Sequence, residues 1–360
     1  MMKKEILALS SLPGLSGRED AVREAIMARL QGNVESMRVD ALGNVLVHKR
    51  GKQRAKHRIL LDAHLDEVGF MVTDITDEGY LHIAAVGGVA ASVCAGRRLT
   101  IQGRQGDVTG VSIINPVHLT DAKDKLSVPA VGELAVDIGA RSRDEASAWV
   151  DLGAAVLFYS DKSNSFTEKN AKNKQILSND KETILTGKAL DNRVGCAVLC
   201  DILCGEVPYD IDAAFTVQEE LGLRGAKMAA YAMQPEIAII LETTTAADVP
   251  GIAPAKQVCV LGDGVAVSFL DNANLYDRDL YQLTLKTAEE QGIKAQPKRA
   301  GSGGNNAGAY AQSAGGARTL AISVPCRNLH SPACVCDFAD VEEMKKLALA
   351  MIERLNANAE

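Results

Sequence analysis

The 360-residue sequence has few aromatic residues and no long apolar run. Phe, Trp and Tyr together make up 4% of the chain, whereas Ala, Val, Gly and Leu are plentiful, which is typical of an α/β core built from small and branched side chains. No apolar segment approaches the ~20 residues needed to span a membrane. The basic start leads into a short apolar run that Pro13 interrupts. We therefore expect neither a signal peptide nor a membrane contact.

A basic stripe is also missing. The formal net charge is −7 and the pI is about 5.5. Because binding phosphates requires a basic face, this balance argues against a nucleic-acid partner.

The eight cysteines include no CxxC pair. Cys196, Cys200 and Cys204 are spaced to share one helix face, and Cys334 and Cys336 alternate. We interpret them as buried free thiols in a reducing compartment, in preference to a disulfide framework or a structural zinc site. This interpretation predicts a cytoplasmic protein.

Two common catalytic loops are absent. The glycine-rich segment 301–304 lacks the lysine and the following Ser or Thr of a phosphate-binding loop, so we expect a loop that lines a site. Ser302 lies in no G-x-S-x-G elbow, which argues against a serine hydrolase that would pair it with His330.

Strand and helix patterns divide the chain into two predicted domains. Near-continuous apolar runs at 58–61, 212–217, 237–241 and 319–324 are typical of a parallel sheet covered on both faces. Helical patterns fall at about 191–203, 278–291 and 341–356. From about Gly69 short β-like runs alternate with glycine turns, and a polar stretch after Phe158 resembles a solvated connection. We predict an α/β domain formed by 1–67 and 161–360, interrupted by a small β-rich domain at 68–160.

Acidic and imidazole side chains follow the strands of the α/β part. In open α/β sheets the crevice beyond the carboxyl ends of the strands binds ligands. Four strands are each followed by such a residue, and Asp191 opens a helix. The candidates are His64, Asp191, Glu219, Glu220, Glu242 and His330.

Two imidazoles and three carboxylates suffice to hold two divalent metal ions, with one carboxylate shared. Since successive residues at a strand end face opposite ways, one of Glu219 and Glu220 can bind metal while the other faces an attacking water. Asp66 has the spacing to orient His64. Each residue alone has a simpler explanation, such as a helix N-cap for Asp191 or a solvated pair for the two glutamates. Their joint placement favours the functional interpretation.

Five ordered motifs carry a family resemblance. They are HLDEVGF at 64–70, KALDNRVG at 188–195, QEELGLRGA at 218–226, GSGG at 301–304 and RNLHSP at 327–332. In this order and spacing they resemble the tetrahedral, glutamyl and deblocking metallo-aminopeptidases, some of whose members were once labelled endoglucanases. The resemblance spans essentially the whole chain.

The resemblance implies a three-layer α/β/α zinc-peptidase domain with an inserted PDZ-like β-barrel used in dimerisation, and twelve subunits assembled into a hollow tetrahedron. Each subunit would bind two zinc or cobalt ions. His64, Asp191 and Glu242 would hold the first ion. Asp191 would be shared with the second ion, alongside Glu220 and His330. Glu219 would be the general base for a metal-bridging hydroxide, with Asp66 orienting His64, and peptides would lose their N-terminal residues.

Three departures from the family pattern concern the surroundings of the site. Glu242 stands where the family usually has Asp. Asn305-Asn306 replaces a usual Thr-Asp, which removes a negative charge near the site. Asn328 and Cys334 replace a usual Tyr and Glu. Residues that can bind metal stand at all five ligand positions of the family. The positions expected near the substrate differ from the family pattern.

Three competing functions remain open at this level. A metal-dependent amidase or deacylase would use the same core on another substrate. A glycoside hydrolase would need two carboxyl groups and no metal ligands, which leaves the two histidines unexplained. A non-enzymatic shell or binding protein would not need an intact Glu219.

Overall fold

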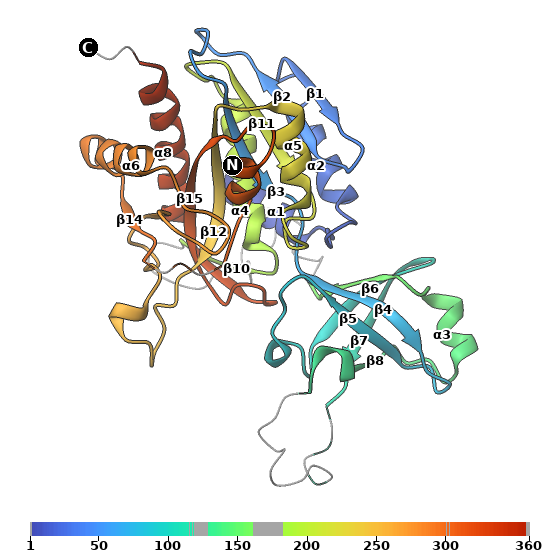
Figure 1. Cartoon of the computed structure of the whole chain (residues 1–360). Coiled ribbons are helices and arrows are strands. Elements are labelled where there is room, and N and C mark those ends of the chain that lie inside the picture. The colour runs from blue at the N-terminus through green and yellow to red at the C-terminus, as the bar shows by residue number, and fades with distance from the viewer. Residues whose placement is uncertain are drawn as a thin grey trace.

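The computed structural model describes residues 2–114, 116, 118, 129–160, 183–299, 301 and 303–357. It contains a large mixed sheet with helices on both faces and, set to one side, a closed six-stranded barrel (Figure 1). This confirms the predicted fold class, a three-layer α/β/α arrangement with an inserted barrel. The predicted polar connection lies almost entirely outside the described residues.

The helices and sheet strands come from both ends of the chain. The helices are α1 (Met2–Ser11), α2 (Asp20–Leu30), α3 (Arg143–Trp149), α4 (Leu190–Cys204), α5 (Arg224–Met233), α6 (Arg278–Gln291), α7 (Ala307–Gln312) and α8 (Phe338–Asn356). The large sheet contains β1 (Ser36–Val39), β2 (Val45–Lys49), β3 (Ile59–His64), β10 (Ile184–Gly187), β11 (Ile211–Thr216), β12 (Ile237–Thr245), β13 (Val265–Val267), β14 (Ala295–Pro297), β15 (Arg318–Arg327) and β16 (Cys334–Asp337).

The centre of this sheet is parallel. Its order is β1-β2-β11-β3-β12-β15-β13-β14, with β16 joining β15 to β10. The neighbours β11, β3, β12 and β15 run in the same direction. Their carboxyl ends therefore meet at one edge of the sheet, which is the geometry on which the prediction of a shared site depends.

Two hydrophobic cores flank the sheet because successive strand residues face opposite sides. In β3, Ile59 and Leu61 join the core formed with α1, α2, α4, α6 and α8. Leu60 joins the core on the other face, which α5 and α7 cover. Near-continuous apolar strands thus result from burial on both faces.

The barrel has its own core. Its strands are β4 (Gly69–Ile75), β5 (Leu81–Val86), β6 (Arg98–Gly103), β7 (Gly106–Ser112), β8 (Ala135–Asp137) and β9 (Ala155–Phe158), closed in the order β4-β5-β8-β7-β6-β9. Phe70 and Phe158 pack edge to face inside it, with ring centroids 5.5 Å apart. These strands fall within the predicted 68–160 insertion.

Helix α3 begins within Ser142-Arg-Asp-Glu145, a sequence that predicts a capping box, in which the Ser and Glu side chains would each accept from the backbone N–H of the other residue. The Ser142 hydroxyl accepts a hydrogen bond from the backbone N–H of Glu145 at 3.2 Å. The Glu145 carboxylate, however, accepts from the N–H of Arg141 instead of that of Ser142, so only half of the expected capping box forms.

All eight cysteines are free thiols, and seven are buried, as predicted. Within the described parts of the chain, no helix is long and apolar enough to cross a membrane.

Candidate metal and active site

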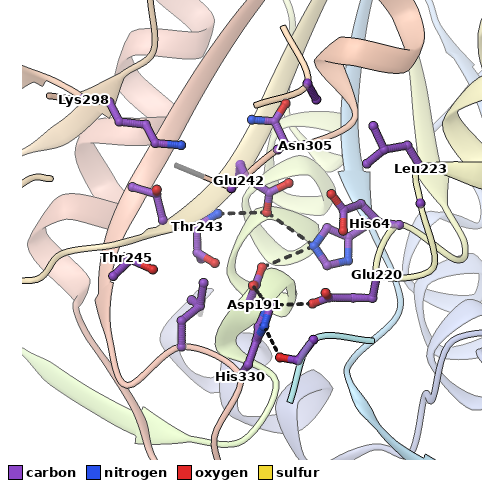
Figure 2. A pocket seen from close by; sticks show the side chains of 18 residues that line it. His64, Asp191, Glu220, Leu223, Glu242, Thr243, Thr245, Lys298, Asn305 and His330 are labelled. Carbon is purple, nitrogen blue, oxygen red and sulfur yellow. Dashed lines mark hydrogen bonds and ion pairs between the residues drawn. The ribbon is translucent and has the colours of Figure 1, made fainter. Parts of the chain in front are cut away.

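The five predicted metal ligands line one cavity of about 470 Å³ at the carboxyl edge of the parallel strands. Figure 2 shows their side chains converging from separate elements. The ligand atoms of His64, Asp191 and Glu220 lie within 4.8 Å of one another. The fold therefore brings together residues that are up to 266 positions apart in the sequence, such as His64 and His330. The sequence analysis predicted that they would share a site.

His64 is the last residue of β3 and is buried. Its Nε2 lies 3.2 Å from Asp191 Oδ1 and 3.4 Å from Glu242 Oε1. On the other side of the ring, Nδ1 lies 3.2 Å from the backbone oxygen of Asp66 and 3.4 Å from its carboxylate. Asp66 thus contacts the nitrogen that faces away from the cluster.

Asp191 lies between the two imidazoles. Its other oxygen is 3.3 Å from His330 Nε2. Asp191 and Asn192 have non-helical backbone angles inside α4, and the peptide bond between them is cis. Asn192 accepts from the N–H of Gly195 at 3.0 Å and donates to the carbonyl of Leu241 at 2.8 Å. The neighbouring asparagine therefore performs the capping function, and the Asp191 carboxylate is turned toward the cluster.

Glu219 and Glu220 lie beyond the end of β11, in a turn after Gln218, whose φ is 54°. The expectation that the two side chains diverge because successive strand residues face opposite ways is therefore wrong. The turn determines where each side chain points. The buried Asp66 carboxylate accepts from the backbone N–H of Glu219 at 3.0 Å and from that of Glu220 at 3.1 Å. Asp66 thus fixes this turn as well as contacting His64.

His330 follows β15, which runs through Pro325 to Arg327. Its Nε2 lies 3.1 Å from Glu220 Oε1. Its Nδ1 donates to the carbonyl of Gly88, which lies just after the barrel strand β5, at 2.8 Å. Sequence reasoning missed Gly88, because a backbone carbonyl leaves no signature in side-chain motifs.

Glu242 lies inside β12 and not after it, because Thr243–Thr245 continue the pairing with β15. Its Oε2 is buried without a hydrogen-bond partner among the described residues. An unpaired carboxylate oxygen in the interior is costly, and a metal ion would satisfy it.

The donor set fits two divalent cations. Ligand atoms held about 2.0–2.2 Å from a tetrahedral zinc ion lie roughly 3.3 Å from each other. The imidazole–carboxylate separations within the two proposed ligand sets are 3.1–3.4 Å. Nitrogen and carboxylate donors suit zinc and cobalt.

Burial governs the proton balance of the cluster. It raises the pKa of Glu242 to about 7 and the pKa of Glu219 well above its usual value. For His330, burial favours the neutral ring, but hydrogen bonds to Asp191 and Glu220 outweigh it and raise the pKa to about 11. Protons on the imidazoles therefore offset the carboxylates in the metal-free protein, and bound cations would replace them.

The residues that depart from the family pattern fall at different depths. Asn305 lines the cavity. Asn306 is fully buried, does not line the cavity and donates to Asp62 Oδ2 at 2.7 Å, so the absent negative charge concerns the buried Asp62. Cys334 is buried, with its thiol 3.4 Å from the backbone oxygen of Asn328.

Two histidines outside the site have acidic partners that spacing did not reveal. His48 Nδ1 lies 2.8 Å from Asp212, and His57 Nδ1 lies 3.1 Å from Glu236. These partners come from distant segments. Neither histidine lines the cavity, so we interpret both as structural or surface residues.

A parallel sheet with a buried imidazole–carboxylate cluster at its carboxyl edge defines a class of α/β proteins built to hold divalent cations and act on a bound ligand. The family described as M42 glutamyl aminopeptidase matches residues 43–347. The chain belongs to this family, and it is an aminopeptidase and hence a hydrolase.

Relatives of similar length support this assignment. A putative aminopeptidase of Acetivibrio thermocellus is 33% identical over 95% of this chain and 96% of its own. The lysyl aminopeptidase of Pyrococcus furiosus is 29% identical, over 99% of this chain and 96% of its own length. The glutamyl aminopeptidase of Lactococcus lactis is also 29% identical, with 98% and 96% covered.

Solved structures share the fold over nearly the whole chain. A TET aminopeptidase from a Thaumarchaeota archaeon has a TM-score of 0.90 at 28% identity, covering 99% of this chain and 96% of that one. The TET1 peptidase of Pyrococcus horikoshii, described as assembling into a tetrahedron or an octahedral shell, has a TM-score of 0.82 at 32% identity, with 98% and 99% covered.

Proposed function

We propose that this aminopeptidase binds two divalent metal ions, zinc or cobalt, and uses them to hydrolyse N-terminal residues from peptides. The observation that carries the proposal is the convergence of His64, Asp191, Glu220, Glu242 and His330 on one cavity. Asp191 contacts both imidazoles through different oxygens, as a carboxylate shared between two ions would. When bound, the ions would lower the pKa of a water molecule and polarise the scissile carbonyl.

Glu219 is the proposed general base. It lines the cavity beside Glu220 but makes no ion pair with either imidazole among the described contacts. Its pKa is raised by burial and by the nearby carboxylates of Glu242, Glu220 and Asp66, although His64 opposes this. Raising the pKa of a carboxyl group makes its carboxylate a stronger base, which favours taking a proton from water and passing it to the leaving amine.

Two residues would hold the ligands in place. Asp66 contacts His64 Nδ1 and fixes the Glu219–Glu220 turn through two backbone hydrogen bonds. The Gly88 carbonyl accepts from His330 Nδ1, which leaves Nε2 directed at Asp191 and Glu220. Such partners raise ligand basicity and fix ring orientation.

The chain is also proposed to assemble. A similar structure is described as a dodecamer, and another as a tetrahedron or an octahedral shell. We propose that this chain forms a dimer-based dodecamer through the barrel at 68–160, with the segments 1–67 and 161–360 forming the catalytic domain.

The test is hydrolysis of a panel of aminoacyl p-nitroanilides by the purified protein, with added zinc or cobalt and with a chelator. Turnover that depends on metal and requires a free α-amine is expected. Activity that survives complete removal of metal would contradict the proposed mechanism.

Matched N-acylated amino acids separate the main alternative. Preferential cleavage of the acyl group would identify a deacylase on the same core. Hydrolysis of neither set by the metal-loaded protein would favour a non-enzymatic role.

A further inference from the structure

A buried carboxylate near the site has no role in the proposed mechanism. Glu19 is the last residue of the connection between α1 and α2, and it is 3% exposed. No cation among the described residues pairs with it. Burying a carboxylate without a cation is costly, and hydrogen bonds have to offset the cost. The hydrogen bonds of Glu19 therefore indicate what the residue does.

Glu19 occupies the N-cap position of α2 but does not cap this helix. A side chain at an N-cap commonly accepts from the free N–H groups of the first helical turn. The Glu19 side chain makes no such bond. Its Oε1 accepts instead from the backbone N–H of Gly17 at 2.6 Å and from that of Gln218 at 3.1 Å. The carboxylate is thus directed at a turn that lies 199 positions away in the sequence.

That turn carries the proposed general base. The Asp66 carboxylate accepts from the N–H groups of Glu219 and Glu220. Glu19 accepts from the preceding N–H group, that of Gln218. Gln218 has a φ of 54°, a left-handed conformation that is uncommon outside glycine and persists where the surroundings hold it. Three consecutive N–H groups are therefore held by two carboxylates, and Glu19 holds the first.

The same connection also supports Asp66. The Ser16 hydroxyl donates to Asp66 Oδ2 at 2.5 Å. The backbone N–H of Ser16 donates to the carbonyl of Glu67 at 3.3 Å, and Leu15 forms a parallel bridge with Glu67. The segment 15–19 is therefore attached to both carboxylates that hold the turn, and not only to the helix that follows it.

We propose that Glu19 is a positioning residue for the reaction, because its hydrogen bond to Gln218 fixes the turn that directs the Glu219 carboxylate into the cavity. This inference rests on the proposed function. Glu220 is also held by its contact with His330, whereas Glu219 contacts neither imidazole among the described ion pairs. Loss of Glu19 should therefore displace the base more than the neighbouring metal ligand.

The experiment measures kcat and KM of the metal-loaded protein on its best aminoacyl p-nitroanilide. Glu19→Ala removes the acceptor, so kcat should fall by about 10- to 100-fold while KM stays within about twofold, as expected for a misplaced reacting group. Glu19→Gln keeps a carbonyl oxygen that can accept both N–H groups and should restore most of kcat. Metal content, measured by elemental analysis, should match wild type in both variants.

Hydrogen exchange gives a readout that does not depend on turnover. The Gln218 amide of the metal-free protein should exchange faster in Glu19→Ala than in wild type. Glu24→Ala, at an exposed position of α2, should change neither exchange nor kcat. Ile26→Ala, at a fully buried position of the same helix, should lower the melting temperature without lowering kcat. If Glu19→Ala does not fold, Glu19→Asp, whose shorter side chain withdraws the oxygen from Gln218, takes its place.

Four outcomes would overturn the proposal. They are wild-type kcat in Glu19→Ala, unchanged exchange of the Gln218 amide in that variant, no rescue by Glu19→Gln, and a loss of kcat that parallels a loss of metal. Equal loss of kcat in Ile26→Ala would likewise reduce Glu19 to a structural role. Absence of metal-dependent turnover in the wild type would instead contradict the proposed function, while the exchange of Gln218 would still show whether Glu19 holds the turn.

Discussion

Single side chains decide the chemistry of this site. Glu219 and Glu220 are neighbours in sequence, yet only Glu220 contacts an imidazole, His330. Asp66 contacts His64 and the backbone of both glutamates. Roles therefore follow from which atom faces which partner, and substitutions that keep shape but change charge are the informative ones.

Replacing Glu219 by Gln tests the general base. The amide keeps the size of the side chain but cannot accept the proton, so kcat should fall by about 10²–10⁴-fold. Metal content, measured by elemental analysis, should stay at the wild-type level. Glu353→Gln, at an exposed position of α8, is the control. Full activity of Glu219→Gln would rule out the assignment.

Asn306→Asp restores the residue usual in the family and tests why asparagine is present. The amide donates to Asp62, and burial raises the pKa of that carboxyl group to about 6. A raised carboxyl pKa means that the folded state holds the proton more tightly, so stability is lost as the pH rises from about 4 through 6. A second carboxyl group here would have to share one proton and would extend this loss to higher pH.

The variant should therefore melt several degrees below wild type at pH 8 and much closer to it at pH 5. The exposed Asn272→Asp should melt like wild type at both values. An Asn306→Asp melting temperature equal to wild type at pH 8 would show that the two carboxyl groups do not interact.

At the scale of elements, buried ions tie together segments that surround the site. Glu67, in the connection from β3 to the barrel, binds Lys188 Nζ at 2.6 Å and lies 3.3 Å from Arg193 of α4. Arg193 also donates to the backbone oxygen of Leu65 at 2.9 Å. All three charged side chains are at most 5% exposed. This network fixes the start of α4, from which Asp191 projects.

Glu67→Gln should destabilise the protein by about 3–5 kcal/mol, because it removes the buried carboxylate charge that faces Lys188 and Arg193. Urea unfolding of the metal-free protein measures the effect. Glu35→Gln provides the contrast, since its pair with Arg50 is exposed and worth at most about 1 kcal/mol. Equal effects of the two substitutions would contradict the argument.

At the scale of the whole molecule, the barrel stands apart from the large sheet (Figure 1). The loop after its strand β5 nevertheless reaches the site, because the Gly88 carbonyl accepts a hydrogen bond from His330. The proposed assembly would use this protruding barrel. Light scattering should then give a mass about twelve times the 38.2 kDa of one chain. A monomer at micromolar concentration would contradict the dodecamer and leave the catalytic proposal untouched.

The sequence by itself determined the fold class and the identity of the clustered residues. Apolar runs such as 237–241 and 319–324 predict parallel strands because burial on both faces requires them, and parallel strands must end at a common edge. His64 and His330 follow from that geometry, whereas Glu242 lies inside β12, which continues to Thr245. The short strands β13, β14 and β16 were not predicted, because three or four residues carry too little pattern.

Only the tertiary structure decided which groups face each other. Spacing allowed Asp191 to be a helix cap, and it was the position of Asn192 beside Leu241 that freed Asp191 for the two imidazoles. The contact from His330 to the Gly88 carbonyl was equally invisible in the sequence. Hydrogen bonding and desolvation depend on three-dimensional neighbours, and those neighbours come from segments that are distant along the chain.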